Sequence, residues 1–343
     1  MKKFLCALAA VWLLVSLPAQ ANARKDVLQL REDRPQEYVV VKGDTLWDIS
    51  SRFLESPWRW PEVWDMNAQI PNPHLIYPGD VIYLVWENGK PKLKVRRGMR
   101  KLSPTARAQP LDRAIPAIPL KDILSFLEET RVIDQSLFKK APYVLAGKNQ
   151  RLIAGAGDRI YARGSLLEDL RRQAVYRATN EYVDPETQEE LGYELTKVSD
   201  VTVVDENDDV VSLTVNRSVL ETRALDRVIP AEEHRIQSVF YPKPSPEALT
   251  GKILSVLGAV NDGGQFDVVA LNRGVREGLE PGHVFAIYRT GEMVVDPITK
   301  EKLQLPAERS GLMMVFKTFE KVSYGLIMMS SNVVSVGDEV REP

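Results

Sequence analysis

The chain has 343 residues, and its 45 basic and 47 acidic side chains leave a formal net charge of −2 at pH 7. This balance argues against a nucleic-acid-binding protein, and the length suggests two or three domains. The one cysteine, Cys6, lies among the first residues, so the rest of the chain has no disulfide, thiolate metal site or cysteine nucleophile.

Residues 1–23 have the pattern of a secretory signal peptide. Lys2 and Lys3 precede an apolar run that is too short to span a membrane, and small residues follow at cleavage spacing. We expect cleavage after Ala21 or Ala23. Residues 24–36 are then expected to be a flexible charged leader, and the mature chain is expected to have no transmembrane segment and to lie in the periplasm.

Residues 37–85 predict one small unit that begins with a strand and a helix. A β-rich run over 38–41 ends before Gly43. Thr45 followed by Asp48 has the spacing of a capping box, which predicts the start of a helix. The apolar residues of that helix recur at helical spacing, at Leu46, Ile49 and Phe53.

A second helix and a closing strand complete this unit. Pro61 suits the first turn of a helix that would end near Asn67. The turn at 78–80 contains Pro and Gly, and it precedes a strand over 81–84. The predicted order is therefore strand, helix, helix, strand.

The pattern Tyr38-x-Val40-x-x-Gly43-Asp44-Thr45-Leu46-Trp47-x-Ile49, with Asn67 and Ile76-x-Pro78-Gly79-Asp80-x-Ile82, resembles a LysM domain. The resemblance implies a βααβ fold and binding of peptidoglycan or another glycan that contains N-acetylglucosamine, in a shallow groove. When the binding positions of LysM domains are transferred to this sequence, the implied glycan-binding residues are Gly43, Asp44, Thr45, Leu46, Asn67, Ala68, Gln69, Ile70, Pro71, Leu75 and Ile76.

Two interpretations of the groove residues stay open. N-acetyl groups need backbone donors and acceptors and a small apolar pocket, which these residues can supply. Turns and helix caps use the same residue types, so Gly43, Thr45 and Asn67 can each be explained without a ligand.

Five tryptophans in or beside this unit also have two possible roles, because their rings can stack on sugars or fill a small core. We expect core packing for Trp47 and Trp64, and leave both roles open for Trp58 and Trp60.

Residues 86–118 are basic and contain several prolines, which predicts a linker, solvated or weakly attracted to an anionic cell wall. Residues 120–134 then predict a short amphipathic helix docked on the next domain. This helix belongs to the first β unit, over 119–245, and residues 246–343 form the second β unit. The predicted fold class is therefore multidomain, with a small βααβ LysM domain followed by two related, predominantly β domains.

An internal repeat supports two related β units. Tyr176, Asp184 and Asp226 are each followed 112 residues later by the same residue type, at Tyr288, Asp296 and Asp338. Asp-Pro at 184 and at 296 favours a turn between strands. The predicted strands lie over 201–204, 210–215, 266–271, 284–288, 312–316 and 325–329.

The second β unit, over 247–341, is similar to the C-terminal domain of the FlgT family, through Gly251-Lys252-Ile253, Gly282-His283-Val284, Tyr288-Arg289 and Val336-Gly337-Asp338. With the leader and single LysM unit, the chain resembles the secretin-associated TsaP family of type IV pilus systems. That resemblance implies a non-enzymatic protein whose LysM domain holds peptidoglycan while the β region contacts an outer-membrane, PilQ-like secretin.

No motif predicts a catalytic residue, a metal or a cofactor. Asp205, Asn207 and Asp209 alternate as in a calcium loop, but Val210 replaces the required glycine and Asn216 the final glutamate, which favours a hairpin turn. The three histidines lack zinc spacing, and no serine lies in a Gly-x-Ser-x-Gly motif. The alternatives that stay open are a cell-wall remodelling enzyme or its activator, and a flagellar basal-body accessory protein.

Overall fold

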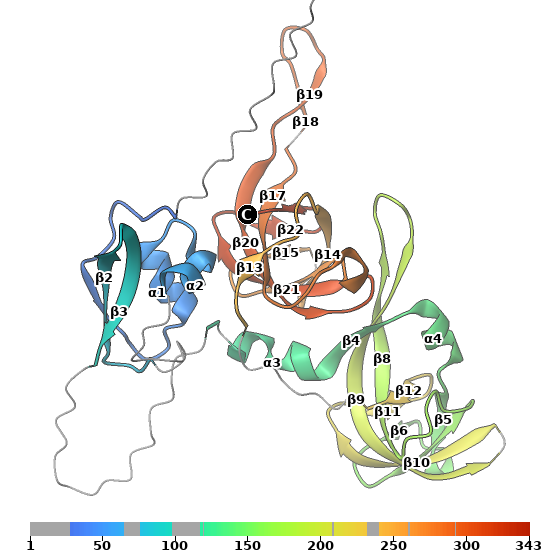
Figure 1. The fold of residues 1–343 in the computed structure, drawn as a ribbon. Coiled ribbons are helices and arrows are strands. Elements are labelled where there is room, and N and C mark those ends of the chain that lie inside the picture. Colours follow the sequence, from blue (N-terminus) through green and yellow to red (C-terminus); the bar gives the residue numbers. More distant parts are fainter. Residues whose placement is uncertain are drawn as a thin grey trace, which may run out of the picture.

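The computed structural model describes residues 28–64, 76–97, 117–118, 120–207, 209–231, 240–259, 261–291 and 293–343. Figure 1 shows three bodies, which we call the N-terminal domain (28–97), barrel 1 (143–230) and barrel 2 (251–341). In the part of the chain described, there is no helix with the length and apolar character needed to cross a membrane.

The N-terminal domain packs two short helices on a three-stranded antiparallel sheet of order β1-β2-β3. Its elements are β1 (Glu37–Val39), α1 (Leu46–Phe53), η1 (Pro57–Arg59), α2 (Trp60–Val63), β2 (Val81–Glu87) and β3 (Lys90–Arg96). Their order confirms the predicted strand, helix, helix, strand. The core between helices and sheet includes Ile49, Phe53 and Ile82, all fully buried.

Two boundaries of this domain differ from the sequence-based prediction. The segment from residue 86 was expected to be linker, but β2 continues to Glu87 and β3 adds a further strand, whose Leu93 is buried. Residues 28–36, the described part of the expected flexible leader, also pack on the domain: the Arg31 N–H donates to the Phe53 carbonyl at 2.9 Å. The physical reason is apolar contact, because Leu28 and Leu30 lie against the core.

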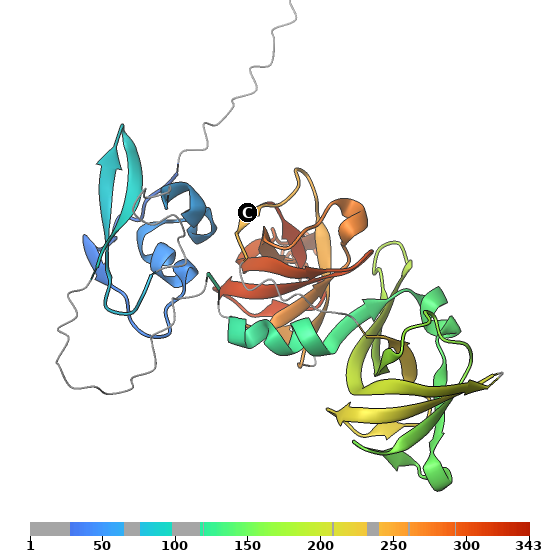
Figure 2. The same ribbon diagram turned by 60° about the horizontal axis from the view of Figure 1, so that its bottom comes forward.

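Between the N-terminal domain and barrel 1, the chain forms α3 (Leu120–Glu129), β4 (Thr130–Ile133) and α4 (Gln135–Lys140). The predicted helix over 120–134 therefore ends at Glu129, and the residues after it pair with barrel 1 as β4. Figure 2 shows α3 lying along barrel 2. Ile123 is fully buried there, and the Lys317 ammonium donates to the Leu127 and Thr130 carbonyls at 3.0 and 2.5 Å.

Barrel 1 is a closed ring of strands in the order β5-β12-β8-β9-β10-β7, with β7 returning to β5. Its elements are β5 (Tyr143–Gly147), η2 (Lys148–Gln150), β6 (Ile153–Ala154), β7 (Arg159–Arg163), β8 (Arg172–Val183), β9 (Glu190–Asn207), β10 (Val210–Ser218), β11 (Thr222–Arg223) and β12 (Arg227–Pro230). The small strands β6 and β11 pair outside the ring.

Barrel 2 closes in the equivalent order β14-β23-β17-β20-β21-β16. Its elements are β14 (Gly251–Leu257), β15 (Asp262–Gly263), β16 (Val268–Leu271), η3 (Val275–Glu277), β17 (His283–Arg289), β18 (Met293–Val295), β19 (Lys302–Gln304), β20 (Glu308–Thr318), β21 (Ser323–Ser330), β22 (Val334–Ser335) and β23 (Glu339–Arg341); β13 (Lys243–Pro244) adds to β17 in parallel. The internal repeat is therefore a repeat of topology.

Each barrel carries one hairpin with the same turn at its tip. The Asp184 Oδ1 accepts the N–H groups of Glu186 and Thr187 at 2.9 and 3.0 Å. The Asp296 Oδ1 accepts those of Ile298 and Thr299 at 2.7 and 3.1 Å. The first hairpin (β8–β9) lies against barrel 2, and we call it the docked hairpin. The second (β18–β19) extends away from all three bodies in Figure 1, and we call it the projecting hairpin.

The sheet of barrel 2 has buried side chains on both its inner and its outer face. Alternate residues of β20 point inward (Met313, Val315) or outward (Leu312, Met314, Phe316), and all five are buried. The outward set joins one cluster with Trp47 of the N-terminal domain, Ile118, Ile123 of α3, and Tyr182 and Leu191 of the docked hairpin. Barrel 2 is therefore the centre on which the other parts pack.

Candidate glycan-binding site

The loop between β1 and α1 forms one side of the predicted groove and holds its shape through its own side chains. Gly43 has φ +103°, in the left-handed region that favours glycine. The Asp44 Oδ2 accepts hydrogen bonds from the Tyr38 hydroxyl and the Val41 N–H, both at 2.9 Å. Burial, with Asp44 as a further cause, raises the pKa of Tyr38, so its hydroxyl stays a donor. Asp44 therefore holds the loop together.

Thr45 is the N-cap of α1, as the capping-box spacing predicted. Its Oγ1 accepts the Asp48 N–H at 3.1 Å, and the Asp48 carboxylate accepts the Thr45 N–H at 3.0 Å. The reciprocal pair satisfies two backbone donors at the helix start. Thr45 is 3% exposed, which fits the role of a helix cap.

The turn before β2 approaches the loop from the other side. The Val40 N–H donates to the Asp80 carbonyl at 2.9 Å, and the Gly79 N–H donates to the Val40 carbonyl at 2.8 Å. These bonds hold the residues next to Ile76 beside β1. Ile76 and Leu46 are both buried in the core cluster of this domain. Two residues of the predicted groove, Leu46 and Ile76, thus lie in one buried cluster, and the groove itself stays a prediction.

The remaining predicted groove residues lie outside the described part of the chain. These are Asn67, Ala68, Gln69, Ile70, Pro71 and Leu75. Their assignment to the groove remains a prediction from the resemblance.

The tryptophans divide into core and surface positions. Trp60 and Trp64 are buried in the core of the N-terminal domain, and Trp47 is buried against the outer face of barrel 2. Trp58 is half-buried and packs on the same barrel face. Trp86 on β2 is 61% exposed. Burial of Trp47 and Trp64 agrees with the predicted packing role, although the packing partner of Trp47 is a different domain.

Two residues that pack on the N-terminal domain were missed by sequence reasoning. The Trp47 N–H, in the first turn of α1, donates to the carbonyl of Ala117 at 3.3 Å. Ala117 is 3% exposed and belongs to the same core cluster as Leu46 and Ile76; its neighbour Ile118 is fully buried beside Trp47. Both residues lie in the predicted linker, and their small or apolar side chains after a basic, proline-containing stretch are the one signal for packing.

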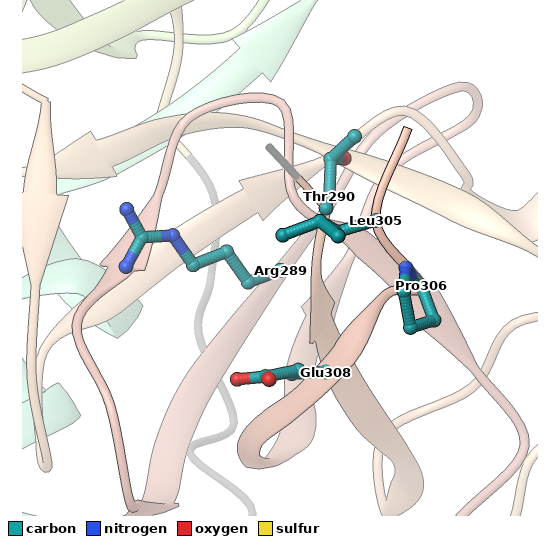
Figure 3. A pocket seen from close by; sticks show the side chains of 6 residues that line it. Arg289, Thr290, Leu305, Pro306 and Glu308 are labelled. Atoms are coloured by element: carbon teal, nitrogen blue, oxygen red, sulfur yellow. The ribbon is translucent and has the colours of Figure 1, made fainter. Parts of the chain in front are cut away.

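Elsewhere the structure offers a pocket at the base of the projecting hairpin. Figure 3 shows Arg289, Thr290, Leu305, Pro306 and Glu308 around it. A Cβ on Gly291 would lie 1.8 Å from the Leu305 carbonyl oxygen, so glycine is needed where the two chains cross. Arg289 and Glu308 are paired in register across β17 and β20. The pocket is part of the hairpin's anchorage and lies in a different domain from the groove.

No group of three or more His, Asp, Glu or Cys side chains among the described residues is arranged to hold a metal ion. The acidic turn that partly resembled a calcium loop is a hairpin end: Asp205 and Asn207 belong to β9, which pairs with β10. The predicted strand at 210–215 is β10, so this segment matches the hairpin interpretation.

Comparison with known proteins supports the assignment of the N-terminal domain. The LysM domain family matches residues 38–85. The chain is also 31% identical over 74 residues to the uncharacterized protein YqbP of Bacillus subtilis (strain 168), a match over 18% of this chain and 34% of YqbP. The shared part is thus about one third of YqbP's length.

The fold and the match together define a protein that carries a carbohydrate-binding module. Residues 38–85 are a LysM domain, a module for binding peptidoglycan or other carbohydrate that has no catalytic role of its own. It is followed by two β barrels of repeated topology.

Proposed function

We propose that this protein is a non-enzymatic periplasmic anchor that binds peptidoglycan through its LysM domain. In this proposal the β region holds an outer-membrane secretin complex of a type IV pilus system. The observation that carries the glycan-binding part is the LysM match over residues 38–85, with its loop, capped helix and turn assembled around Leu46 and Ile76. The secretin part rests on the resemblance to TsaP-family proteins and on the surface described next.

The projecting hairpin supports a partner-binding role for barrel 2. In the docked hairpin, Tyr182 and Leu191 are each 2% exposed against the outer face of barrel 2. The positions 112 residues later, Val294 and Leu303, are also apolar, and Ile298 at the tip is 88% exposed. Exposed apolar residues on a hairpin whose counterpart is buried against a β surface favour docking on a β-rich partner. We propose the secretin as that partner.

The glycan-binding part is tested by co-sedimentation of the full chain with purified peptidoglycan sacculi. The double variant Asn67→Ala, Ile70→Ala should lose pelleting, because the groove would lose a polar contact and an apolar wall. Ile298→Ala, a change of similar size in the projecting hairpin, is the matched control and should pellet like the unchanged protein. Equal pelleting of all three proteins would remove the groove assignment.

The partner part is tested by affinity capture with the full chain from detergent-solubilised cell envelopes, followed by mass spectrometry. We expect a type IV pilus secretin to be recovered, and to be lost with the double variant Ile298→Asp, Leu303→Asp. The control Leu152→Asp changes a leucine of barrel 1 that is 85% exposed, close to the 88% of Ile298. Recovery of flagellar or wall-synthesis proteins without a secretin would overturn the pilus assignment and leave the glycan-binding part standing.

A further inference from the structure

The two barrels have the same turn after the equivalent strands β11 and β22. In barrel 1, the Asp226 N–H donates to the Arg223 carbonyl at 3.3 Å, and the Asp226 Oδ2 accepts the Arg223 N–H at 2.8 Å. In barrel 2, the Asp338 N–H donates to the Ser335 carbonyl at 3.1 Å, and the Asp338 Oδ2 accepts the Ser335 N–H at 2.9 Å. The side chains of the two turns can therefore be compared position by position.

Leu225 occupies the third position of its turn, where barrel 2 has Gly337. Their φ angles are +73° and +91°, in the left-handed region that favours glycine. Leu225 is 74% exposed, so its side chain gains little packing that would offset the backbone strain. An exposed leucine held in a strained conformation points to a role outside the fold.

The strand paired with β11 also has apolar residues where barrel 2 has polar ones. Ile153 of β6 lies opposite Arg223. In barrel 2, Asp262 of β15 lies opposite Ser335, whose hydroxyl it binds at 2.6 Å. Ile153 is 51% exposed, and Leu152 before it is 85% exposed. Barrel 1 therefore presents aliphatic side chains on a backbone that barrel 2 covers with polar groups.

These aliphatic residues form one surface, which we call the end patch. Leu225 lies beside β5, because its N–H donates to the Val144 carbonyl at 2.9 Å. Leu145, the next residue of β5, is 42% exposed. Ile153 lies opposite the first residue of the turn that contains Leu225. The end patch consists of Leu145, Leu152, Ile153 and Leu225.

Basic side chains border the end patch. Arg151 and Arg223 have side chains that are 63% and 58% exposed, and Lys148 of the same loop as Arg151 is exposed too. Two carboxylates lie among them, Asp158 at 3.3 Å from Arg151 and Glu221 at 3.3 Å from Arg223. Exposed ion pairs of this kind contribute little energy, so both guanidinium groups remain available to an anionic surface.

We propose that the end patch binds the surface of a phospholipid membrane. Leucine and isoleucine side chains enter the acyl region favourably, and arginine and lysine beside them are attracted to lipid phosphates. All four side chains of the patch are aliphatic, whereas the hot spots of protein–protein interfaces are enriched in aromatic residues and depleted in leucine. These observations favour lipid over a protein partner.

The position of barrel 1 suits this role. It lies at the opposite end of the molecule from the N-terminal domain, with barrel 2 between them (Figures 1 and 2). One chain can thus contact a membrane at one end and the cell wall at the other. Only the contact with the wall rests on the proposed function.

The test is flotation with vesicles of phosphatidylethanolamine and phosphatidylglycerol. The mature chain, residues 24–343, is used because the apolar run of the expected signal peptide would itself bind lipid. The double variant Leu152→Asp, Leu225→Asp should partition at least about tenfold more weakly, because two leucines no longer enter the acyl region. Vesicles of phosphatidylcholine alone have no net charge and should bind the unchanged protein more weakly.

Val333 and Val336 provide the matched control. They flank β22 at the equivalent end of barrel 2 and are 53% and 44% exposed. The double variant Val333→Asp, Val336→Asp should float like the unchanged protein.

Leu225→Gly separates lipid binding from folding. It gives barrel 1 the residue that barrel 2 has in this turn and removes the backbone strain. It should therefore unfold at the same urea concentration as the unchanged protein or a higher one, and yet bind vesicles more weakly.

The other outcomes contradict the proposal. Equal flotation of the unchanged protein and of Leu152→Asp, Leu225→Asp would overturn it, as would absence of flotation for every variant. If the unchanged protein is a dimer by light scattering and this double variant a monomer, without vesicle binding, the end patch is an interface between copies of this chain. Pelleting with sacculi is measured separately, so failure of the glycan-binding function and failure of membrane binding are distinguishable.

Discussion

At the scale of single residues, the repeat provides an internal comparison for Asp184. Asp184 and Asp296 cap identical turns, but Asp184 is 3% exposed and makes contacts that the projecting hairpin does not share. Its Oδ2 accepts from the Asn272 side chain at 2.8 Å, and Arg273 lies 3.6 Å away. Burial opposes ionisation of Asp184, yet these groups and the two turn N–H groups hold its pKa below the ordinary value.

We therefore expect Asp184→Ala to destabilise the protein more than Asp296→Ala. Both variants lose the hydrogen bonds of the turn, which lowers the free energy of unfolding by about 1 kcal/mol. Asp184→Ala also leaves the buried Asn272 amide without its acceptor, which adds roughly 1–3 kcal/mol. Urea unfolding followed by circular dichroism measures both losses. Equal midpoints for the two variants would show that docking of the first hairpin contributes no stability through Asp184.

The site residues show which part of a function can be read from local sequence. The capping pair Thr45–Asp48 lies within one helical turn, so its spacing was sufficient to predict the contact seen. The contact between Trp47 and Ala117 joins residues far apart in the chain, and neither has a local pattern that points to the other. The groove residues Asn67–Pro71 were available from family resemblance alone.

At the scale of elements, strands were predicted well and their partners were not. The six strand segments predicted from periodicity all lie within or overlap β9, β10, β16, β17, β20 and β21. Closure into barrels depends on pairing between the first and last strands of each unit, which is a long-range property. Whether a hairpin packs on another domain or projects from the molecule likewise depends on long-range contacts, which local sequence does not specify.

The strand β3 was missed although the sequence contained a signal for it. Asn88-Gly89 is a dipeptide typical of tight hairpin turns, and both residues have positive φ, 53° and 74°. After it, Leu93 and Val95 alternate with lysines and an arginine, which gives the period of two that a half-buried strand requires. The basic charge and Pro91 favoured a linker instead. Glu87, paired with Lys94 across the turn, neutralises part of that charge.

At the scale of the whole molecule, the barrels are joined by an ionic contact with a defined pH dependence. Glu189 of the docked hairpin accepts from Arg276 at 2.7 and 3.0 Å and lies 2.9 Å from Lys321, both of barrel 2. The hydrogen bond from Arg276, followed by that from Lys321, lowers the pKa of Glu189 from 4.5 to about 2. The group is partly exposed, so solvent reduces the energy of this contact.

A lowered pKa means that the contact stabilises docking fully above about pH 4.5 and loses this effect as the pH falls towards 2. We expect the distance between the two barrels to become more variable over that range, as measured by small-angle X-ray scattering. Glu189→Gln should show part of this change already at pH 7 and a smaller further change on acidification. Glu301→Gln, at the matching position of the projecting hairpin, is the control. A profile for Glu189→Gln that coincides with that of the unchanged protein would contradict the role of this contact.

The ring closure of barrel 2 has a consequence for how the chain acquires its structure. Its first strand, β14, pairs with its last, β23, with Gly251 opposite Val340, so the pair joins residues far apart in the chain. During synthesis the edge of β14 therefore stays without this neighbour until the residues of β23 have emerged. An unpaired edge in a β-rich, apolar unit invites association with other unfolded chains. Because β23 completes the ring, a substitution that weakens its pairing with β14 would prolong this vulnerable stage.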